Sequence, residues 1–383
     1  MDFVLSSEQQ ALADSVERFC RRQYGFEARR VALEEADGFS RANLAAFADL
    51  GWFGAGLPED AGGFGGGPIE TAIIMERFGR ALVVEPFLSC AVLALQTLAA
   101  LGSGADRDRL IEGIVAGEIL ASLAHGEAAA RGDLGHVETR AERAGMGWRL
   151  TGRKSLVEGV ASAGALLVSA RADAGIGLFL VSPDAPGLRV QPYRTLDNHR
   201  SGDLWLEGTP ASAMLAAPGE AAPAIAAGAD HALIGVCAEA VGAMETAIFA
   251  TRDYLITRRQ FGAPLAGFQA LQHRMADMLV ELELSRSILY QGIAALDAPA
   301  GERARGISAM KAVVGAAALF VGRNAVQLHG AIGMTEDCAI GHYYRRLYVI
   351  ASQFGDESHH LARLAAGGVG FWPDIVEPPP QAA

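Results

Sequence analysis

Two long helical patterns joined by a short turn constrain the fold of this chain more than any other feature. Before the turn, apolar residues recur at spacings of three and four, at Ile234, Cys237, Val241, Met244 and Ile248. After it, similar spacings are found at Phe268, Leu271, Met275, Met278 and Leu282. Gly262 and Pro264 lie between the two patterns and are typical of a helix end and a turn. The sequence therefore predicts two amphipathic helices joined by a loop.

The spacing of apolar residues changes twice along the chain. Residues 1 to about 116 carry helical patterns, and the first begins at a predicted capping box of Ser6 and Gln9. Short apolar or alternating runs, bounded by Gly, Pro and Asp, follow to about residue 213. No helical pattern of about 10 residues separates these runs, which disfavours a βαβ dinucleotide-binding fold. They predict a compact antiparallel barrel.

The order of these patterns predicts an α+β chain of three domains. An N-terminal helical domain is expected over residues 1–116, and a small middle β-barrel with its linker over residues 117–222. A C-terminal bundle of four helices is expected over residues 223–383. The tail after about residue 371 contains three consecutive prolines and is predicted to be frayed.

Composition narrows the classes of partner and site. The net charge of −12 and the apolar share of 51% predict a globular protein that binds neither nucleic acid nor a membrane surface. Charges or glycines interrupt the apolar stretches before about 18 residues, so we expect no transmembrane helix. The four cysteines form no C-x-x-C pair and no basic, apolar leader opens the chain, which predicts a cytoplasmic protein with reduced thiols. The nine histidines form no zinc pattern, so no metal site is expected.

Two motifs resemble those of a known family. The run R-R-Q-F-G-A-P-L at residues 258–265, followed by F-Q at 268–269, resembles the flavin-binding turn of the acyl-CoA dehydrogenases. The run P-E-D-A-G-G at residues 58–63 also resembles that family and matches no phosphate-loop pattern. The predicted order of domains is that of the same family. Within this family, the sequence resembles most the proteins described as pimeloyl-CoA dehydrogenase small subunits. We take this resemblance as a sign of lineage and not of the substrate.

The resemblance implies FAD as the cofactor, because no side chain accepts a hydride. It implies that Arg258 binds the pyrophosphate. The other residues that it assigns to the cofactor are Gln260, Phe261, Phe268, Gln269, Gln327, Gly330, Ala331 and Ser358. In the family, FAD lies largely at subunit contacts. The chain is therefore expected to form a homo-dimer or tetramer, or a hetero-oligomer with a second acyl-CoA dehydrogenase chain.

For dehydrogenation of an acyl-CoA substrate, the resemblance implies a carboxylate that takes the α-proton while flavin N5 takes the β-hydride. Aligning Leu361 and Arg363 with the family's last helix places Asp356 at the position of this base, with Glu357 in reserve. Asp356 could equally be the N-cap of that helix. Aspartate is one methylene shorter than the usual glutamate, and a displacement near 1 Å could cost about 100-fold in rate unless the loop shifts.

The chain departs from the family at several positions. Residues 124–133 replace the usual T-E-P-G-A-G-S-D segment, Leu156 replaces a flavin-contacting tryptophan, and Leu233 replaces a common arginine. Three functions therefore remain open. The first is a dehydrogenase that passes electrons to an electron-transfer flavoprotein. The second is a weakly catalytic or inactive structural subunit of a hetero-oligomer, and the third is an oxidase that uses dioxygen directly.

Overall fold

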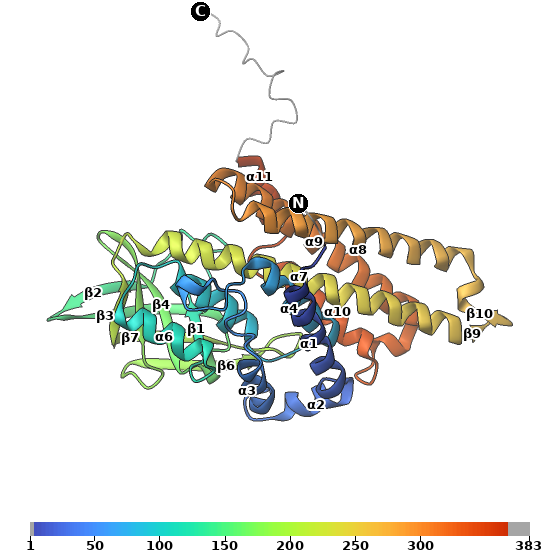
Figure 1. Ribbon diagram of the computed structural model, residues 1–383, viewed down its shortest axis with the longest axis horizontal. Coiled ribbons are helices and arrows are strands. Elements are labelled where there is room, and N and C mark those ends of the chain that lie inside the picture. The colour runs from blue at the N-terminus through green and yellow to red at the C-terminus, as the bar shows by residue number, and fades with distance from the viewer. Residues whose placement is uncertain (1–3, 367–383) are drawn as a thin grey trace, which may run out of the picture.

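The structure is a computed structural model that describes residues 4–366. The tail that was predicted to be frayed after about residue 371 lies outside the described residues. Helices come first, then strands, then helices again, as Figure 1 shows. The predicted architecture of an N-terminal helical domain, a middle β-domain and a C-terminal helical bundle is confirmed.

The first domain is helical throughout, and its first helix begins at the predicted capping box. Ser6 Oγ accepts from Gln9 N–H at 3.2 Å, and Gln9 Oε1 accepts from Ser6 N–H at 3.0 Å. Its elements are α1 (Ser7–Gln23), α2 (Phe26–Glu34), α3 (Arg41–Asp49), η1 (Glu59–Ala61), α4 (Pro68–Ala81), η2 (Leu88–Ala94), α5 (Leu95–Ala99) and α6 (Ala105–Val115). The segment η2 is a π-helix, a form that is rare and often found at functional sites.

The β-domain is one mixed sheet. Its strands are β1 (Ala121–Ala124), β2 (Arg140–Ala144), β3 (Gly147–Glu158), β4 (Ala165–Ala172), β5 (Gly175–Val181), β6 (Leu188–Arg194), β7 (Arg200–Pro210) and β8 (Ala213–Ala216), with η3 (Val160–Ser162) after β3. The strand order is β6-β7-β3-β2-β4-β5-β8, and β1 pairs with β4 in parallel. The expectation of an antiparallel barrel was therefore wrong in part, because β1 and β2 both pair with β4 in parallel, whereas the other pairings in this sheet are antiparallel.

The last domain is a bundle built around α9. Its elements are α7 (Ala221–Thr257), β9 (Arg259–Gln260), β10 (Ala263–Pro264), η4 (Leu265–Gly267), α8 (Gln269–Ala295), α9 (Ala300–His329), η5 (Gly330–Met334), α10 (Ala339–Ser352) and α11 (Glu357–Ala366). Helices α7, α8, α10 and α11 all contact α9. The predicted turn between the first two helices of the bundle becomes a short β9–β10 hairpin, which points away from the β-domain (Figure 1).

Two helical segments, Ala221–Thr257 and Ala300–Met334, are long and apolar enough to cross a membrane by length and composition alone. In the most apolar 18-residue stretch of each segment, 83% of the first and 56% of the second is buried inside the protein. Core helices of globular proteins pass the same test, so these segments are weak evidence for a membrane span.

A buried arginine joins the domains. Arg346 of α10 donates from Nε and Nη2 to the Glu239 carboxylate of α7, with both distances 2.5 Å. Its Nη1 lies 2.7 Å from Asp197 Oδ2, in the loop between β6 and β7. Arg29 of α2 donates to the backbone carbonyl of the same Asp197 at 3.4 Å. One guanidinium therefore neutralises carboxylates from the β-domain and the bundle, beside a second arginine from the first domain.

We predict that Arg346→Ala destabilises the fold by about 3–5 kcal/mol, because two buried carboxylates lose their counter-charge. Arg21→Ala is the control, since its ion pair with Glu17 is exposed and should contribute about 1 kcal/mol or less. Urea denaturation of both variants measures the free energy of unfolding. Equal losses in the two variants would contradict the role given to Arg346.

Candidate functional site

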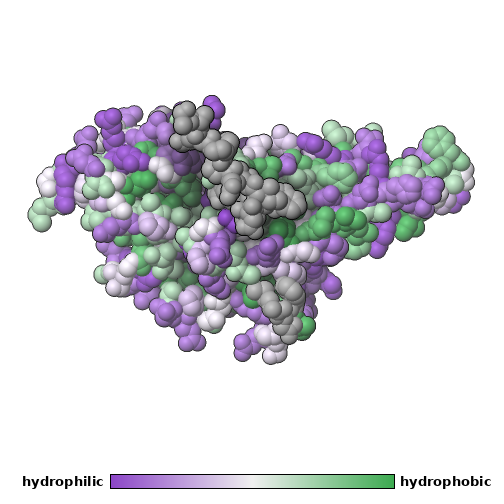
Figure 2. Space-filling view, turned by 90° about the horizontal axis from the view of Figure 1, so that it is seen from above, coloured by the Kyte–Doolittle hydropathy of each residue, from purple (hydrophilic) through white to green (hydrophobic). Residues whose placement is uncertain are grey.

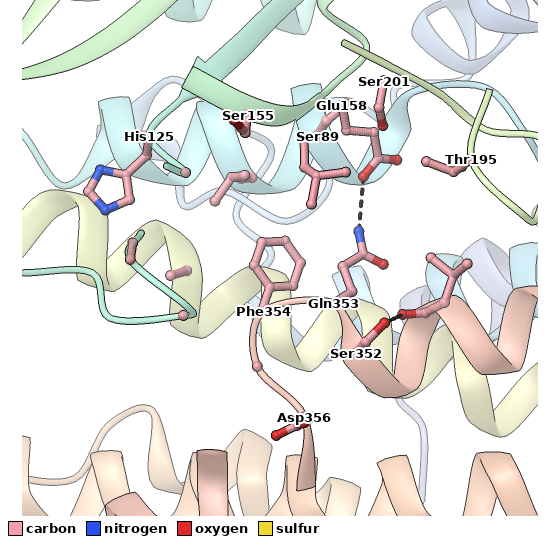
Figure 3. Close-up of a pocket in the computed structure, with 18 of the residues that line it drawn as sticks. Ser89, His125, Ser155, Glu158, Thr195, Ser201, Ser352, Gln353, Phe354 and Asp356 are labelled. Carbon is pink, nitrogen blue, oxygen red and sulfur yellow. Dashed lines mark hydrogen bonds between the residues drawn. The ribbon is translucent and has the colours of Figure 1, made fainter. Parts of the chain in front are cut away.

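A cavity of about 760 Å³ lies where the three domains meet. Its walls come from η2, from strands and loops of the β-domain, from α7, and from the turn between α10 and α11. Cavities of this size hold small molecules and cofactors. Figure 3 shows the side chains that line it. We take this cavity as the candidate functional site.

The inner wall of the cavity is apolar. Leu93 comes from η2 and Leu123 from β1. Ile225, Ala229 and Leu233 follow one another at intervals of four residues, so they share one face of α7. Leu123, Ile225, Ala229 and Leu233 are buried, and Leu93 is half-buried. A hydrocarbon chain placed against this wall would be removed from water, which favours binding.

A buried ion pair lies on the β-domain side of the cavity, where Glu127 is one of the lining residues. Lys154 Nζ lies 2.7 Å from Glu127 Oε1 and also donates to Ser169 Oγ and to the His125 carbonyl. Thr139 donates its N–H and its hydroxyl to the Glu127 carboxylate. Burial by itself would raise the pKa of Glu127, but the Lys154 charge and these hydrogen bonds outweigh it and lower the pKa to about 2. Glu127 is therefore a fixed anion and a poor proton acceptor.

One cluster of possible metal ligands lies beside this pair. Ligand atoms of Glu127, His136 and Glu138 lie within 4.8 Å of one another. A cation there would compete with Lys154 for the Glu127 carboxylate, and His136 already contacts Glu138 at 3.2 Å. These contacts give no support to a metal site at the cluster.

Glu158 links the β-domain to the turn after α10 across the cavity. Its Oε2 accepts from Gln353 Nε2 at 2.9 Å, the contact drawn in Figure 3. Its Oε1 lies 3.5 Å from His199 Nδ1. No motif in the sequence marks Glu158 as a functional residue. Only the position of the strand beside the bundle shows that this carboxylate lines the cavity.

Leu156 is held in a strained conformation at the mouth of the cavity. Its φ is +56°, a left-handed value that costs a residue other than glycine about 1–2 kcal/mol. Its N–H lies 3.2 Å from both Tyr193 Oη and Asp203 Oδ1. The Leu156 side chain is 70% exposed, and the cavity-lining Leu134 and Leu196 are 36% and 54% exposed. Strain and exposed apolar surface together are typical of a place that a ligand covers.

The structure places the proposed base at the edge of the cavity. Asp356 is exposed, and its Oδ1 accepts from His359 N–H at 2.8 Å, so it caps α11 as one interpretation of the sequence predicted. Glu357 and Ser358 begin α11 and are also exposed. Among the described lining residues, Asp356 belongs to the cavity, whereas Glu357 and Ser358 do not. Figure 3 shows the ring of Phe354 directed toward the β-domain and Asp356 on the other side of the turn.

The residues predicted to bind the cofactor lie elsewhere. Arg258, Gln260 and Phe261 belong to the β9–β10 hairpin and its approach, and Phe261 is 91% exposed. Phe268 packs edge-to-face on Phe261, with 6.1 Å between ring centroids, and Gln269 begins α8. Across the lining described for the cavity, none of these residues appears. Cofactor binding by these residues stays a prediction. A cofactor that they bind would contact them at a place outside this chain's own cavity.

The second predicted turn lies close to the first. Gln327 is exposed in the last turn of α9, and Gly330 and Ala331 are exposed in η5. Tyr254, near the end of α7, stacks on His329 with 4.4 Å between ring centroids. The structure therefore brings the two turns of the bundle together, and it separates them from Asp356.

The chain is similar to known proteins along nearly its whole length. Residues 6–118, 122–209 and 223–368 match the models described as the N-terminal, middle and C-terminal domains of acyl-CoA dehydrogenase. The acyl-CoA dehydrogenase FadE12 of Mycobacterium tuberculosis is 30% identical, over 74% of this chain and 76% of its own. Glutaryl-CoA dehydrogenase of Desulfococcus multivorans is 28% identical, over 90% and 92%. The ChsE4–ChsE5 complex of Mycobacterium tuberculosis has a similar fold, with a TM-score of 0.86, 26% identity and coverage of 96% and 98%.

We predict that Glu127→Gln destabilises the protein at pH 7 by on the order of 3 kcal/mol, because Lys154 stays buried without a counter-charge. The pKa of Glu127 is lowered in the folded state, so its stabilising effect is complete above about pH 4.5 and is lost as the pH falls toward 2. The difference between the native protein and the variant should therefore shrink over that window. Urea denaturation between pH 7 and pH 3 measures it.

The control for this experiment is Glu138→Gln, since the Glu138 side chain is 67% exposed and should change stability little. A difference between native protein and Glu127→Gln that stays constant down to pH 3 would contradict the assignment of a fixed anion.

Proposed function

Because the chain belongs to the acyl-CoA dehydrogenase family, we propose that its cavity carries out FAD-dependent α,β-dehydrogenation of an acyl-CoA thioester. Members of this family are oxidoreductases that act on CH–CH bonds. The observation that carries the proposal is that Asp356 edges a cavity of about 760 Å³ whose inner wall is apolar. An acyl chain on that wall would bring a carboxylate near its thioester end.

The mouth of the cavity fits a flat, partly apolar cofactor. Leu134, Leu156 and Leu196 expose apolar side chains there, and the backbone of Leu156 is strained. A leucine offers less stacking area than the tryptophan found in the family, so contact with a flavin ring would be weaker. FAD bound here would supply the acceptor for the β-hydride.

Arginines at the edge of the cavity suit the phosphates of coenzyme A. Arg131, Arg194 and Arg363 line the cavity and are exposed. Because the net charge is −12, a ligand that carries phosphates needs such local cations. In contrast, Arg346 is buried and paired with two carboxylates, so it is not available to a ligand.

In this proposal Asp356 removes the α-proton. A carboxylate removes a weakly acidic proton efficiently only where it is shielded from water and where the enolate oxygen meets hydrogen-bond donors. Asp356 is exposed in the single chain, and the half-buried ring of Phe354 lies on the other side of the turn. The acyl-CoA or a second subunit must therefore supply the remaining shield.

Assembly follows from the separation of the cofactor turns and the cavity. The hairpin with Arg258 and Phe261 is exposed and lies at the far end of the bundle (Figure 1). Apolar surface extends along the projecting part of the bundle (Figure 2). Exposed apolar side chains on α7, α8 and α9 are Ile256, Leu279, Val280, Leu284, Val313 and Phe320. We propose that this surface packs on another subunit, whose FAD then meets the Arg258 hairpin.

A second candidate is that the chain serves as a structural subunit of a hetero-oligomer. The exposed Arg258 hairpin favours it, because a chain can lend this turn to a partner whether or not its own cavity is active. The similar ChsE4–ChsE5 structure is described as a complex of two proteins, which supports this arrangement. In either case we propose that electrons pass to an electron-transfer flavoprotein in the cytoplasm, and the alternative acceptor is dioxygen.

The first test is reduction of the flavin. We predict that the purified protein carries FAD and that acyl-CoA bleaches it without air, whereas Asp356→Asn keeps FAD and binds acyl-CoA but bleaches at least about 100-fold more slowly. Glu357→Gln is the matched control and should remain active. Stopped-flow absorbance measures the rates, and reoxidation by oxygen separates oxidase from dehydrogenase. Bleaching lost only in Glu357→Gln would move the base, and activity in both variants would place it on a partner chain.

The second test concerns Arg258. Arg258→Ala should lower FAD retention about tenfold or more, because a guanidinium to phosphate contact is charge-assisted. Arg252→Ala is the control, since Arg252 is exposed on α7, the helix that ends just before Arg258, and pairs with Asp253. The ratio of flavin to protein is measured by absorbance, and the mass of the assembly by light scattering. A monomer that carries full FAD, or a variant with unchanged FAD content, would contradict the proposal.

A further inference from the structure

We propose that Lys311 is a positioning residue for the segment 351–356, which carries Phe354 into the cavity and places Asp356 at its edge. The proposal deepens the proposed function and rests on it for the role of Asp356. The contacts between Lys311 and the segment do not depend on the reaction, so the ordering of the segment and the proposed function can be tested separately.

Lys311 bridges the two ends of the turn. It lies in the middle of α9 and is fully buried. Its Nζ donates to the Ala351 carbonyl at 3.0 Å and to the Gly355 carbonyl at 2.8 Å. Ala351 is in the last turn of α10, where backbone carbonyls lack helical partners and the helix dipole is negative. One ammonium therefore binds a carbonyl at the end of α10 and another at the end of the turn, and holds the two ends close to each other.

The turn needs such a hold because its backbone is strained. Phe354 and Gly355 have φ values of +58° and +102°, two left-handed residues in succession. Glycine takes this conformation easily, but phenylalanine does not. Strained residues persist when surrounding contacts determine them. The carbonyl of Gly355 directly precedes Asp356, so the contact with Lys311 acts one peptide bond away from the carboxylate residue.

Two further contacts hold other parts of the same segment. His360 Nε2 lies 3.1 Å from the Phe354 carbonyl, and burial lowers the pKa of this histidine to about 4, so the ring is neutral. Gln353 is held by Glu158 of the β-domain. Each contact comes from a different element, and Lys311 supplies the one that spans the turn.

A purely structural role explains Lys311 less well. Burial lowers the pKa of Lys311, so the charged form is costly at this place. Among the ion pairs of residues 4–366, none joins Lys311 to a carboxylate within 4.0 Å, and the ammonium is satisfied by the backbone of the turn instead. The sequence has lysine only at Lys154 and Lys311, and arginine at its other basic positions. An ammonium is compact and carries three donors, so it can donate to both carbonyls at once.

The first experiment compares Lys311→Met with Met310→Ala in the FAD-loaded protein. Methionine keeps the bulk of the side chain and removes its donors. Met310 is the neighbouring buried residue, and it packs toward Gly292 of α8 and not toward the turn. Hydrogen exchange followed by mass spectrometry should show peptides over residues 351–358 exchanging about tenfold or more faster in Lys311→Met, the factor that loss of a charged hydrogen bond gives. Met310→Ala should show no such local change.

The second experiment separates positioning from binding. Octanoyl-CoA and pimeloyl-CoA are tried first, and the one that bleaches the native flavin is used. For Lys311→Met, kcat should fall by about 100-fold, as a displacement near 1 Å would give, while KM changes less than about threefold. Met310→Ala should leave both constants close to native. Lys311→Gln keeps two N–H donors on a shorter side chain, so it should lie between Lys311→Met and the native protein, and it replaces Lys311→Met if that variant fails to fold.

Two results would overturn the proposal. One is an exchange pattern in Lys311→Met or Lys311→Gln that matches Met310→Ala, and the other is a native kcat in these variants. If neither acyl-CoA bleaches the native protein, the proposed function fails, and the exchange experiment still decides whether Lys311 orders the turn.

Discussion

The buried guanidinium of Arg346 is the interaction on which the arrangement of this molecule depends. It pairs with Glu239 of the bundle and with Asp197 of the β-domain, where Arg29 of the first domain also donates. Buried charges are costly unless they are paired, so these residues tolerate only a narrow range of domain positions. Arg346 and Asp197 also line the cavity. The interaction that orients the domains therefore shapes the site between them.

The turn after α10 is held in place by contacts from several surrounding elements. Its residues are neither helix nor strand, and Phe354 is strained. Lys311 from α9, His360 from α11 and Glu158 from β3 each contact the segment, so three elements determine its conformation. A functional group on a loop is placed accurately only when the surrounding structure leaves the loop few alternatives.

The candidate site is divided between two places in the chain. The cavity with Asp356 lies at the junction of the domains, whereas the Arg258 hairpin and the turn at Gly330 lie together at the far end of the bundle. In the arrangement proposed above, one cofactor would use the cavity of one subunit and the Arg258 hairpin of another. This division agrees with the exposed apolar residues on α8. It also agrees with the two substitutions that the family resemblance indicates, Leu156 for a flavin-contacting tryptophan and Leu233 for an arginine.

Three features follow from the sequence alone, namely the order of helical and β segments, the capping box at Ser6 and the turn near Gly262, because each depends on residues that are near neighbours along the chain. The resemblance of the 258–269 motif to a flavin-binding turn was also local. Tertiary contacts alone establish the pairs Arg346–Glu239, Lys154–Glu127 and Glu158–Gln353 and the parallel pairing of β1 with β4. The N-cap role of Asp356 was one of two interpretations that the sequence left open, and the structure adds that this residue is exposed. The regular hydrogen bonding of helices and strands produces a periodic pattern of apolar residues in the sequence. Contacts between distant polar residues produce no such pattern, because a buried carboxylate can pair with any donor that the fold brings to it.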